Sequence, residues 1–133
     1  MKLIICLDDR CGMAWGGRRQ SRDRLVTEDI VRHVGSAPLY VTPYSVPLFD
    51  GYSLDLRVSE NPLSDAPEHA FCFLEHTAPK DCDRIGELIV YRWNRHYPSD
   101  VTFDPAAFDF STVSSTEFAG FSHEKITKEV LKR

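Results

Sequence analysis

The chain has 133 residues, of which 42% are hydrophobic and 27% charged, and its formal net charge is −4. That length is typical of one hydrophobic core, so we expect a single domain over residues 1–133. The acidic balance argues against broad, non-specific nucleic-acid binding. No apolar run approaches the roughly 18 residues of a membrane span. The apolar segment 3–7 is too short for a signal-peptide core, which predicts a cytoplasmic protein.

The first predicted element is a buried strand over 3–7, because this continuous apolar run is too short for a helix. Asp8 and Asp9 end it, and a loop containing several glycines follows. Ser21 is placed to cap a helix over about 22–33, which has apolar residues at helical spacing.

Further along, residues 39–41 form a second predicted strand. Residues 43–49 can form a short helix, because proline at the first helical position loses no hydrogen bond. The alternation of apolar and polar residues over 52–58 predicts a half-buried strand. Residues 59–69 contain two prolines and are predicted to be a loop or one short helical turn.

Two more buried strands are predicted at 70–74 and 88–93, with a brief helix at 79–85 between them. We expect these two strands to be adjacent members of one sheet. Strands that alternate with helices indicate a largely parallel α/β sheet. Residues 110–113 and 118–121 look like strand and turn, and 123–133 suits either a helix, with Glu and Lys at i,i+4, or a strand of period two.

The order of several segments resembles the dihydrofolate reductase fold. LIICLDDRCGMAW resembles the first strand and glycine-containing loop of that family, and ELIVYRWNRHYPSDVTF its late strand and G-D-T-x-F-P segment. DFSTVSSTEF and ITKEVLKR resemble its closing strands. The resemblance implies a dihydrofolate reductase-like single α/β domain, with a mostly parallel central sheet, flanking helices and C-terminal antiparallel strands. It also implies that the tail is a strand.

The positions that hold NADPH in that family differ here. Glu75 and His76 stand where the family has two glycines, and neither residue permits the close approach of a pyrophosphate that glycine allows. Residues 42–45 replace the family's G-R-x-T and contain no arginine. The family's pterin-binding acid has three nearby matches, at Asp23, Glu28 and Asp29. We therefore expect no NADPH-dependent folate reduction and no bound cofactor.

The chain also resembles short bacterial chains labelled ribonuclease Z. Members of that family carry a His-x-His-x-Asp-His motif that holds two zinc ions for phosphodiester hydrolysis. No such motif occurs in this sequence. Binding of RNA, which the net charge disfavours, is therefore not supported by any motif.

The segment 16–24 is the main candidate for a ligand site. It combines two glycines, four arginines and the expected start of a helix, whose N-terminus favours negative charge. The sequence therefore predicts an anion site that includes Arg18, Arg19, Ser21 and Arg22. The alternative is a solvated loop whose arginines pair with surface carboxylates.

A second mixture of aromatic and cationic residues occupies 92–97. Arg92 and Arg95 could clamp a phosphate while Trp93 stacks on a ring. The more ordinary interpretation is a core tryptophan flanked by surface arginines.

Catalytic and metal-binding signals are weaker. Asp8 and Asp9 follow the first strand, at the edge where open α/β sheets bind ligands, and with Asp29 they are the candidates for acid/base chemistry or for binding a polar ring edge. The alternative for Asp8 and Asp9, which we favour, is that they only start the turn. His123 is interpreted as a surface histidine. The spacing of His69, Cys72, His76 and Cys82 fits no zinc motif, so no metal is predicted.

Three functions therefore stay open at this stage. The first is a domain that binds a small anionic ligand, such as a nucleotide or a pterin-like ring, in a cleft between the loop 12–24, the first helix and the turn 42–45. The second is an enzyme, either a divergent reductase or a hydrolase of nucleotides or RNA. The third is a regulatory or interaction domain without ligand chemistry.

Overall fold

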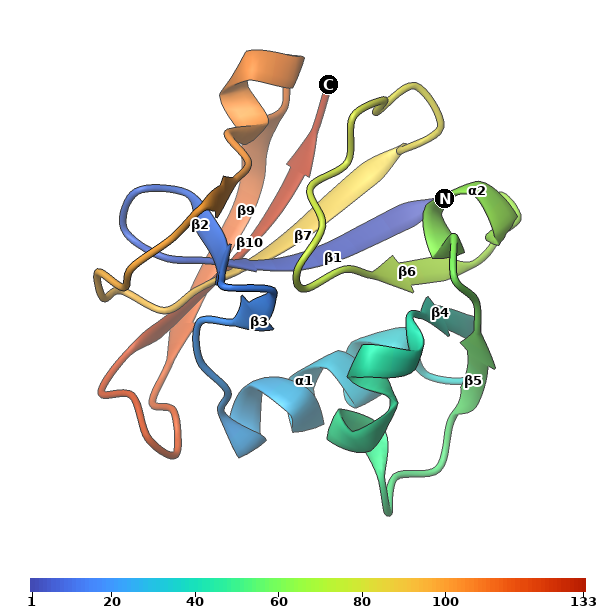
Figure 1. The fold of residues 1–133 in the computed structure, drawn as a ribbon, viewed down its shortest axis with the longest axis horizontal. Coiled ribbons are helices and arrows are strands. Elements are labelled where there is room, and N and C mark those ends of the chain that lie inside the picture. Colours follow the sequence, from blue (N-terminus) through green and yellow to red (C-terminus); the bar gives the residue numbers. More distant parts are fainter.

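The computed structural model describes residues 1–133 as a twisted sheet with a helical layer on one face (Figure 1). The seven-stranded sheet has the order β5-β4-β6-β1-β7-β10-β9. Its strands are β1 (Lys2–Leu7), β4 (Pro38–Val41), β5 (Asp55–Val58), β6 (Phe71–Phe73), β7 (Glu87–Arg92), β9 (Ser111–Phe118) and β10 (Ile126–Lys132). A small second sheet contains β2 (Gly12–Trp15), β3 (Arg18–Arg19) and β8 (Val101–Thr102).

The strands β5, β4, β6, β1 and β7 run parallel, and β10 and β9 complete the sheet as antiparallel strands. The mostly parallel sheet and the strand at the C-terminus are thus present. The expectation that 70–74 and 88–93 are adjacent is wrong, because β1 lies between β6 and β7 and pairs with both. The first strand occupies the centre because all of its apolar residues can be buried there by neighbours on both sides.

Alternation along the central strands divides the core into two clusters. Leu3, Ile5 and Leu7 contribute to the cluster on one face, and Ile4 to the cluster on the other. α1 (Arg24–Val34) packs on the second face through Val26, Ile30 and Val34, and Figure 1 shows it beside the 3₁₀ helix η1 (Pro43–Phe49).

The first face has no long helix. Ala78, Cys82 and Ile85 from the segment after β6 cover it, together with Phe103, Phe108 and Phe110 from around η2 (Pro105–Phe108). The helix predicted over 79–85 is absent, and this stretch is a series of turns. Individual buried side chains, rather than an apolar stripe along a helix, hold this segment against the sheet.

Several predicted boundaries shift. The first helix begins two residues later than expected, and its cap is Asp23 rather than Ser21, since the Asp23 carboxylate accepts a hydrogen bond from the Leu25 amide at 2.9 Å. Within 59–69, α2 (Pro62–Asp65) supplies the short helical turn. The half-buried strand 52–58 is reduced to β5.

No helix of this fold has the length and apolar character that crossing a bilayer would require.

Candidate functional site

A cleft opens where the parallel strands end, between the sheet, α1 and the loop that follows β2. It contains about 400 Å³ of unfilled space, part of it open to solvent, and little of this space admits a whole water molecule. Its apolar wall consists of Cys6, Met13, Val26, Ile30, Leu48, Phe73 and Trp93, and its polar wall of Arg19, Gln20, Ser21, Arg22, Asp23, Thr27 and Glu75. Carboxyl ends of parallel strands are where open α/β sheets place ligands.

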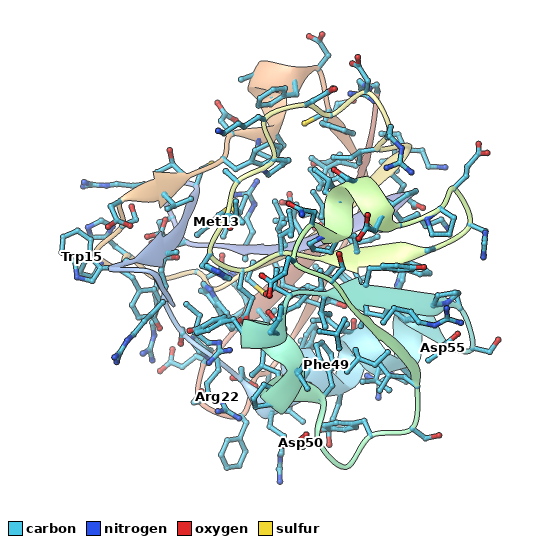
Figure 2. The ribbon with its side chains drawn as sticks, turned by 45° about the vertical axis from the view of Figure 1, so that its right-hand side comes forward. Met13, Trp15, Arg22, Phe49, Asp50 and Asp55 are labelled. Atoms are coloured by element: carbon cyan, nitrogen blue, oxygen red, sulfur yellow. The ribbon has the colours of Figure 1, made fainter.

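Residues of the loop 12–24 and of the first helix therefore line one cleft, but the turn 42–45 does not. η1 contributes Leu48 in its place. Ser45 acts indirectly, because its hydroxyl donates to Glu75 Oε2 at 2.7 Å. Figure 2 shows Arg22 at the rim of the molecule, on the connection between β3 and α1.

Glu75 is the acidic centre of the polar wall. Arg19 donates to both of its carboxylate oxygens, with Nε–Oε1 and Nη2–Oε2 distances of 2.7 and 2.9 Å. The guanidinium also lies 4.5 Å from the centre of the Tyr44 ring. Hydrogen bonding to Glu75 raises the pKa of Arg19, although burial alone would lower it. The two charges are thus fixed against each other, and Arg19 is not a free cation.

Asp23 is the second buried acid of the site. Its carboxylate accepts from the backbone amides of Phe121 and Ser122, both at 2.9 Å, in addition to capping α1. It also lies 2.9 Å from Nδ1 of His123. Burial would raise the pKa of Asp23, but the hydrogen bonds from Phe121, His123 and Ser122 hold it well below its ordinary value. Asp23 is therefore a carboxylate at neutral pH, in the folded protein.

His123 is not a surface histidine, since only 4% of it is exposed. The turn between β9 and β10 carries it to the start of α1, where its ring stacks on Trp93 with a centroid distance of 4.7 Å. Its Nε2 lies 2.9 Å from the Tyr97 hydroxyl and 3.1 Å from Ser21 Oγ. The separation of 100 residues between Asp23 and His123 explains why no local sequence pattern could identify this pair.

The other predicted arginines do not converge on the cleft. Arg18 is exposed on β3, and Arg95 is exposed beyond β7. Arg92 pairs with Glu129 of the neighbouring strand. Among the residues predicted to bind an anion, Arg19, Ser21 and Arg22 line the cleft, and of these two arginines only Arg19 forms a salt bridge.

Asp8, Asp9 and Asp29 lie outside the cleft. Asp8 is fully buried and accepts from the Arg10, Gly12 and Tyr97 amides and from Gln20. Burial would raise its pKa, but these bonds lower it, so the carboxylate stays ionised and organises the loop after β1. Asp9 is exposed. Asp29 binds Tyr91 and Lys128 at 2.6 and 2.8 Å, on a side of α1 that does not border the cleft.

One residue that lines the cleft carries an acceptor without a hydrogen-bond partner. Oε1 of Gln20 is buried and unpaired, although Nε2 of the same amide donates to Asp8 at 3.1 Å. The buried Thr42 Oγ1 and His76 Nδ1 are also unpaired, and the His76 ring packs at a tilt against Tyr44 with a centroid distance of 4.7 Å. Buried polar atoms are normally paired, so Gln20 Oε1, which is closed to solvent here, could serve as an acceptor only for a ligand that moves this side chain.

Thiol and metal chemistry find little support. The four cysteines are free, and burial raises the pKa of Cys6, which borders the cleft, and raises that of Cys72 to about 12. Raised pKa values disfavour the reactive thiolate. No group of three or more His, Cys, Asp or Glu side chains is arranged to hold a metal ion.

Comparison with known proteins identifies the fold. No protein-family model and no curated protein sequence matches the chain. Among solved structures, it is similar to a dihydrofolate reductase from Enterococcus faecalis complexed with NADP(H) and RAB-propyl. The TM-score is 0.67 and the sequence identity 8%, over 99% of this chain and 95% of that one. At this identity the likeness shows the fold alone. The chain therefore has a divergent form of the dihydrofolate reductase fold.

Proposed function

We propose that the cleft binds a small, flat, anionic ligand of the nucleotide or pterin-like class. The observation that carries this proposal is the composition of the cleft, in which apolar side chains such as Phe73 and Trp93 face a polar wall with a free arginine and an unpaired acceptor. Apolar walls with a few placed polar groups are the usual form of a small-molecule site.

Each part of the ligand has a matching feature. Arg22 provides a positive charge at the rim, suited to a phosphate or carboxylate. Gln20 Oε1 can accept a hydrogen bond from a ring N–H. Glu75 is already paired with Arg19, so the unpaired charge that a ligand meets in the cleft is that of Arg22.

NADPH is not the ligand that we propose, although the Enterococcus faecalis enzyme was solved with NADP(H). In this chain Glu75 and His76 follow β6, and the Glu75 carboxylate is held in place by Arg19 and Ser45. A fixed carboxylate at that turn repels a pyrophosphate, and residues with side chains keep it from close contact with the backbone.

A melting screen with mononucleotides, pterin carboxylates, folates and nicotinamide cofactors tests the proposal. A ligand present at 100 times its dissociation constant stabilises the folded state by about 2.7 kcal/mol. That corresponds to a rise of roughly 8–13 °C in Tm for a domain of this size. We expect such a rise with a mononucleotide or a pterin carboxylate, and a larger one than with NADPH.

Two variants locate the binding. Arg22→Ala should abolish most of the rise in Tm. Arg24→Ala is the matched control, because Arg24 is nearby and stacks on the exposed Phe121 but does not line the cleft. No rise with any of the four ligand classes would refute the proposal and favour an interaction domain.

A hydrolase is the second candidate, favoured by one observation, the hydrogen-bonded series of Ser21, His123 and Asp23.

A further inference from the structure

A hydroxyl, an imidazole and a carboxylate form a continuous series at the wall of the cleft. Ser21 Oγ lies 3.1 Å from Nε2 of His123, and Nδ1 of the same ring lies 2.9 Å from Asp23 Oδ2. Segments far apart in the sequence meet here. Ser21 and Asp23 precede α1, and His123 lies in the turn before β10. This order of groups activates a serine hydroxyl as a nucleophile when the imidazole accepts its proton.

The surroundings of Asp23 determine which nitrogen of the ring carries hydrogen. An ionised carboxylate only accepts hydrogen bonds, so the proton between it and His123 belongs to Nδ1. Backbone amides of Leu25, Phe121 and Ser122 also donate to this carboxylate and hold it in place. With Nδ1 turned to Asp23, Nε2 is the ring nitrogen that faces the hydroxyls of Ser21 and Tyr97.

The ring itself has little freedom to turn. It is buried and stacked on Trp93 at an interplanar angle of 25°, and Ser122 Oγ lies 3.3 Å from Nδ1. A positioned imidazole of this kind does not need to reorganise when it accepts a proton. The fixed geometry thus fits a general base as well as a structural support.

Ser21 is half-buried and lines the same cleft as Arg22, Val26 and Ile30. The residues that line the cleft with Ser21 therefore offer a substrate both apolar surface and a positive charge. A small ester or thioester that carries an anionic group matches these neighbours.

We infer that Ser21 is a nucleophile that hydrolyses such esters or thioesters, with His123 as general base and Asp23 as the positioning residue. This inference rests on the proposed function, because the substrate occupies the proposed ligand cleft. Ser21 Oγ forms a bond to the carbonyl carbon, and its proton passes to Nε2 of His123. The imidazolium then gives that proton to the departing alkoxide or thiolate as the ester or thioester bond breaks, which leaves an acyl-serine.

Water completes the reaction. It attacks the acyl carbon while His123 takes one of its protons, and the return of that proton to Ser21 Oγ releases a carboxylic acid and restores the serine. Arg22, which lines the cleft, holds the anionic group of the substrate. No oxidant, reductant or further reactant is needed.

Tyr97 is the alternative nucleophile of this cluster. Its hydroxyl lies 2.9 Å from Nε2 of His123 and 3.3 Å from Ser21 Oγ. It does not line the cleft, whereas Ser21 does. Tyr97→Phe removes this competing donor, so the variant should keep or increase the reactivity of Ser21.

The first test is covalent labelling with an alkyl fluorophosphonate, with the adduct located by mass spectrometry. We expect one adduct, on Ser21, in the folded wild-type protein. Ser21→Ala should abolish it, and His123→Gln should slow it by roughly 100-fold or more, the usual contribution of a general base. Ser115→Ala removes an exposed serine on β9 and should change nothing. Circular dichroism establishes that each variant is folded.

The second test compares the mono-4-nitrophenyl ester of succinic acid with neutral 4-nitrophenyl acetate. We expect the wild type to prefer the anionic ester in kcat/KM, and Arg22→Ala to lose this preference while still reacting with fluorophosphonate.

A purely structural network would leave Ser21 unlabelled, or labelled no faster than Ser115 in the same wild-type sample, and either result overturns the inference. A fluorophosphonate adduct on Tyr97 that survives Ser21→Ala also overturns it. Labelling without any ligand-induced rise in Tm would refute only the proposed binding of a nucleotide or pterin. A rise in Tm without labelling would refute only the hydrolase.

Discussion

The acid that caps α1 should make an unusually large contribution to stability. In Asp23→Ala the backbone amides of Leu25, Phe121 and Ser122 lose their common acceptor. Loss of an N-cap acceptor costs about 1 kcal/mol. Each of the other two orphaned amides costs about 1 kcal/mol or slightly more. The free energy of unfolding should therefore fall by about 3–4 kcal/mol, a large part of the ~5–15 kcal/mol that holds a typical domain folded.

Chemical and thermal denaturation would measure this loss. For a domain of this length the expected decrease in Tm is roughly 10–15 °C. Asp50→Ala is the matched control, because Asp50 is exposed at the end of η1 and its loss should change the unfolding free energy by less than about 0.5 kcal/mol. A decrease in Tm for Asp23→Ala that does not exceed that of Asp50→Ala would refute the reasoning that one carboxylate joins α1 to the turn before β10.

Four further outcomes are expected. The hydrogen bonds to Asp23 lower its pKa in the folded state, so the folded state binds fewer protons than the unfolded state. The stability advantage of wild type over Asp23→Asn should therefore be complete above about pH 5 and shrink as the pH falls below about 4, and an advantage that grows in acid would contradict this. Gly120→Ala should destabilise by about 1–3 kcal/mol, because a Cβ there would lie 2.6 Å from Asp23 Oδ2, whereas Gly86→Ala, with its nearest atom at 3.9 Å, should have little effect in the same denaturation assay. Tyr91→Phe should lower the free energy of unfolding by about 1–2 kcal/mol, since it removes a 2.6 Å hydrogen bond to Asp29 from a fully buried ring. An unchanged unfolding midpoint would exclude a net contribution from that bond. A double-mutant cycle of Arg19→Ala and Glu75→Ala should give a coupling free energy of about 1–3 kcal/mol, because the pair is bidentate and largely shielded from solvent, and a coupling near zero would contradict the inferred fixed charge pair.

The sequence alone determined most of the strands. The apolar runs at 3–7, 70–74 and 88–93 are too short for helices and too apolar for loops, so they could only be buried strands. The closing segments carried enough of a known pattern to identify the fold, which the structural comparison confirms. Local chemistry indicated a helix beginning near residue 22, but it favoured Ser21 as the cap, whereas Asp23 caps α1 in the structure.

Only the tertiary structure decided which strands are neighbours and which side chains form the site. β1 separates β6 from β7 because strand order depends on how the whole sheet buries its apolar faces, and no local pattern records it. Arg19 appeared to be a free cation until Glu75, 56 residues away, was found to hold it. His123 looked like a surface residue because its partners Asp23 and Trp93 reach it only after the chain has folded. Hydrogen bonds and charge pairs of this kind act over a few ångströms in space, whatever their separation along the chain, so they remain hidden until the fold brings the residues together.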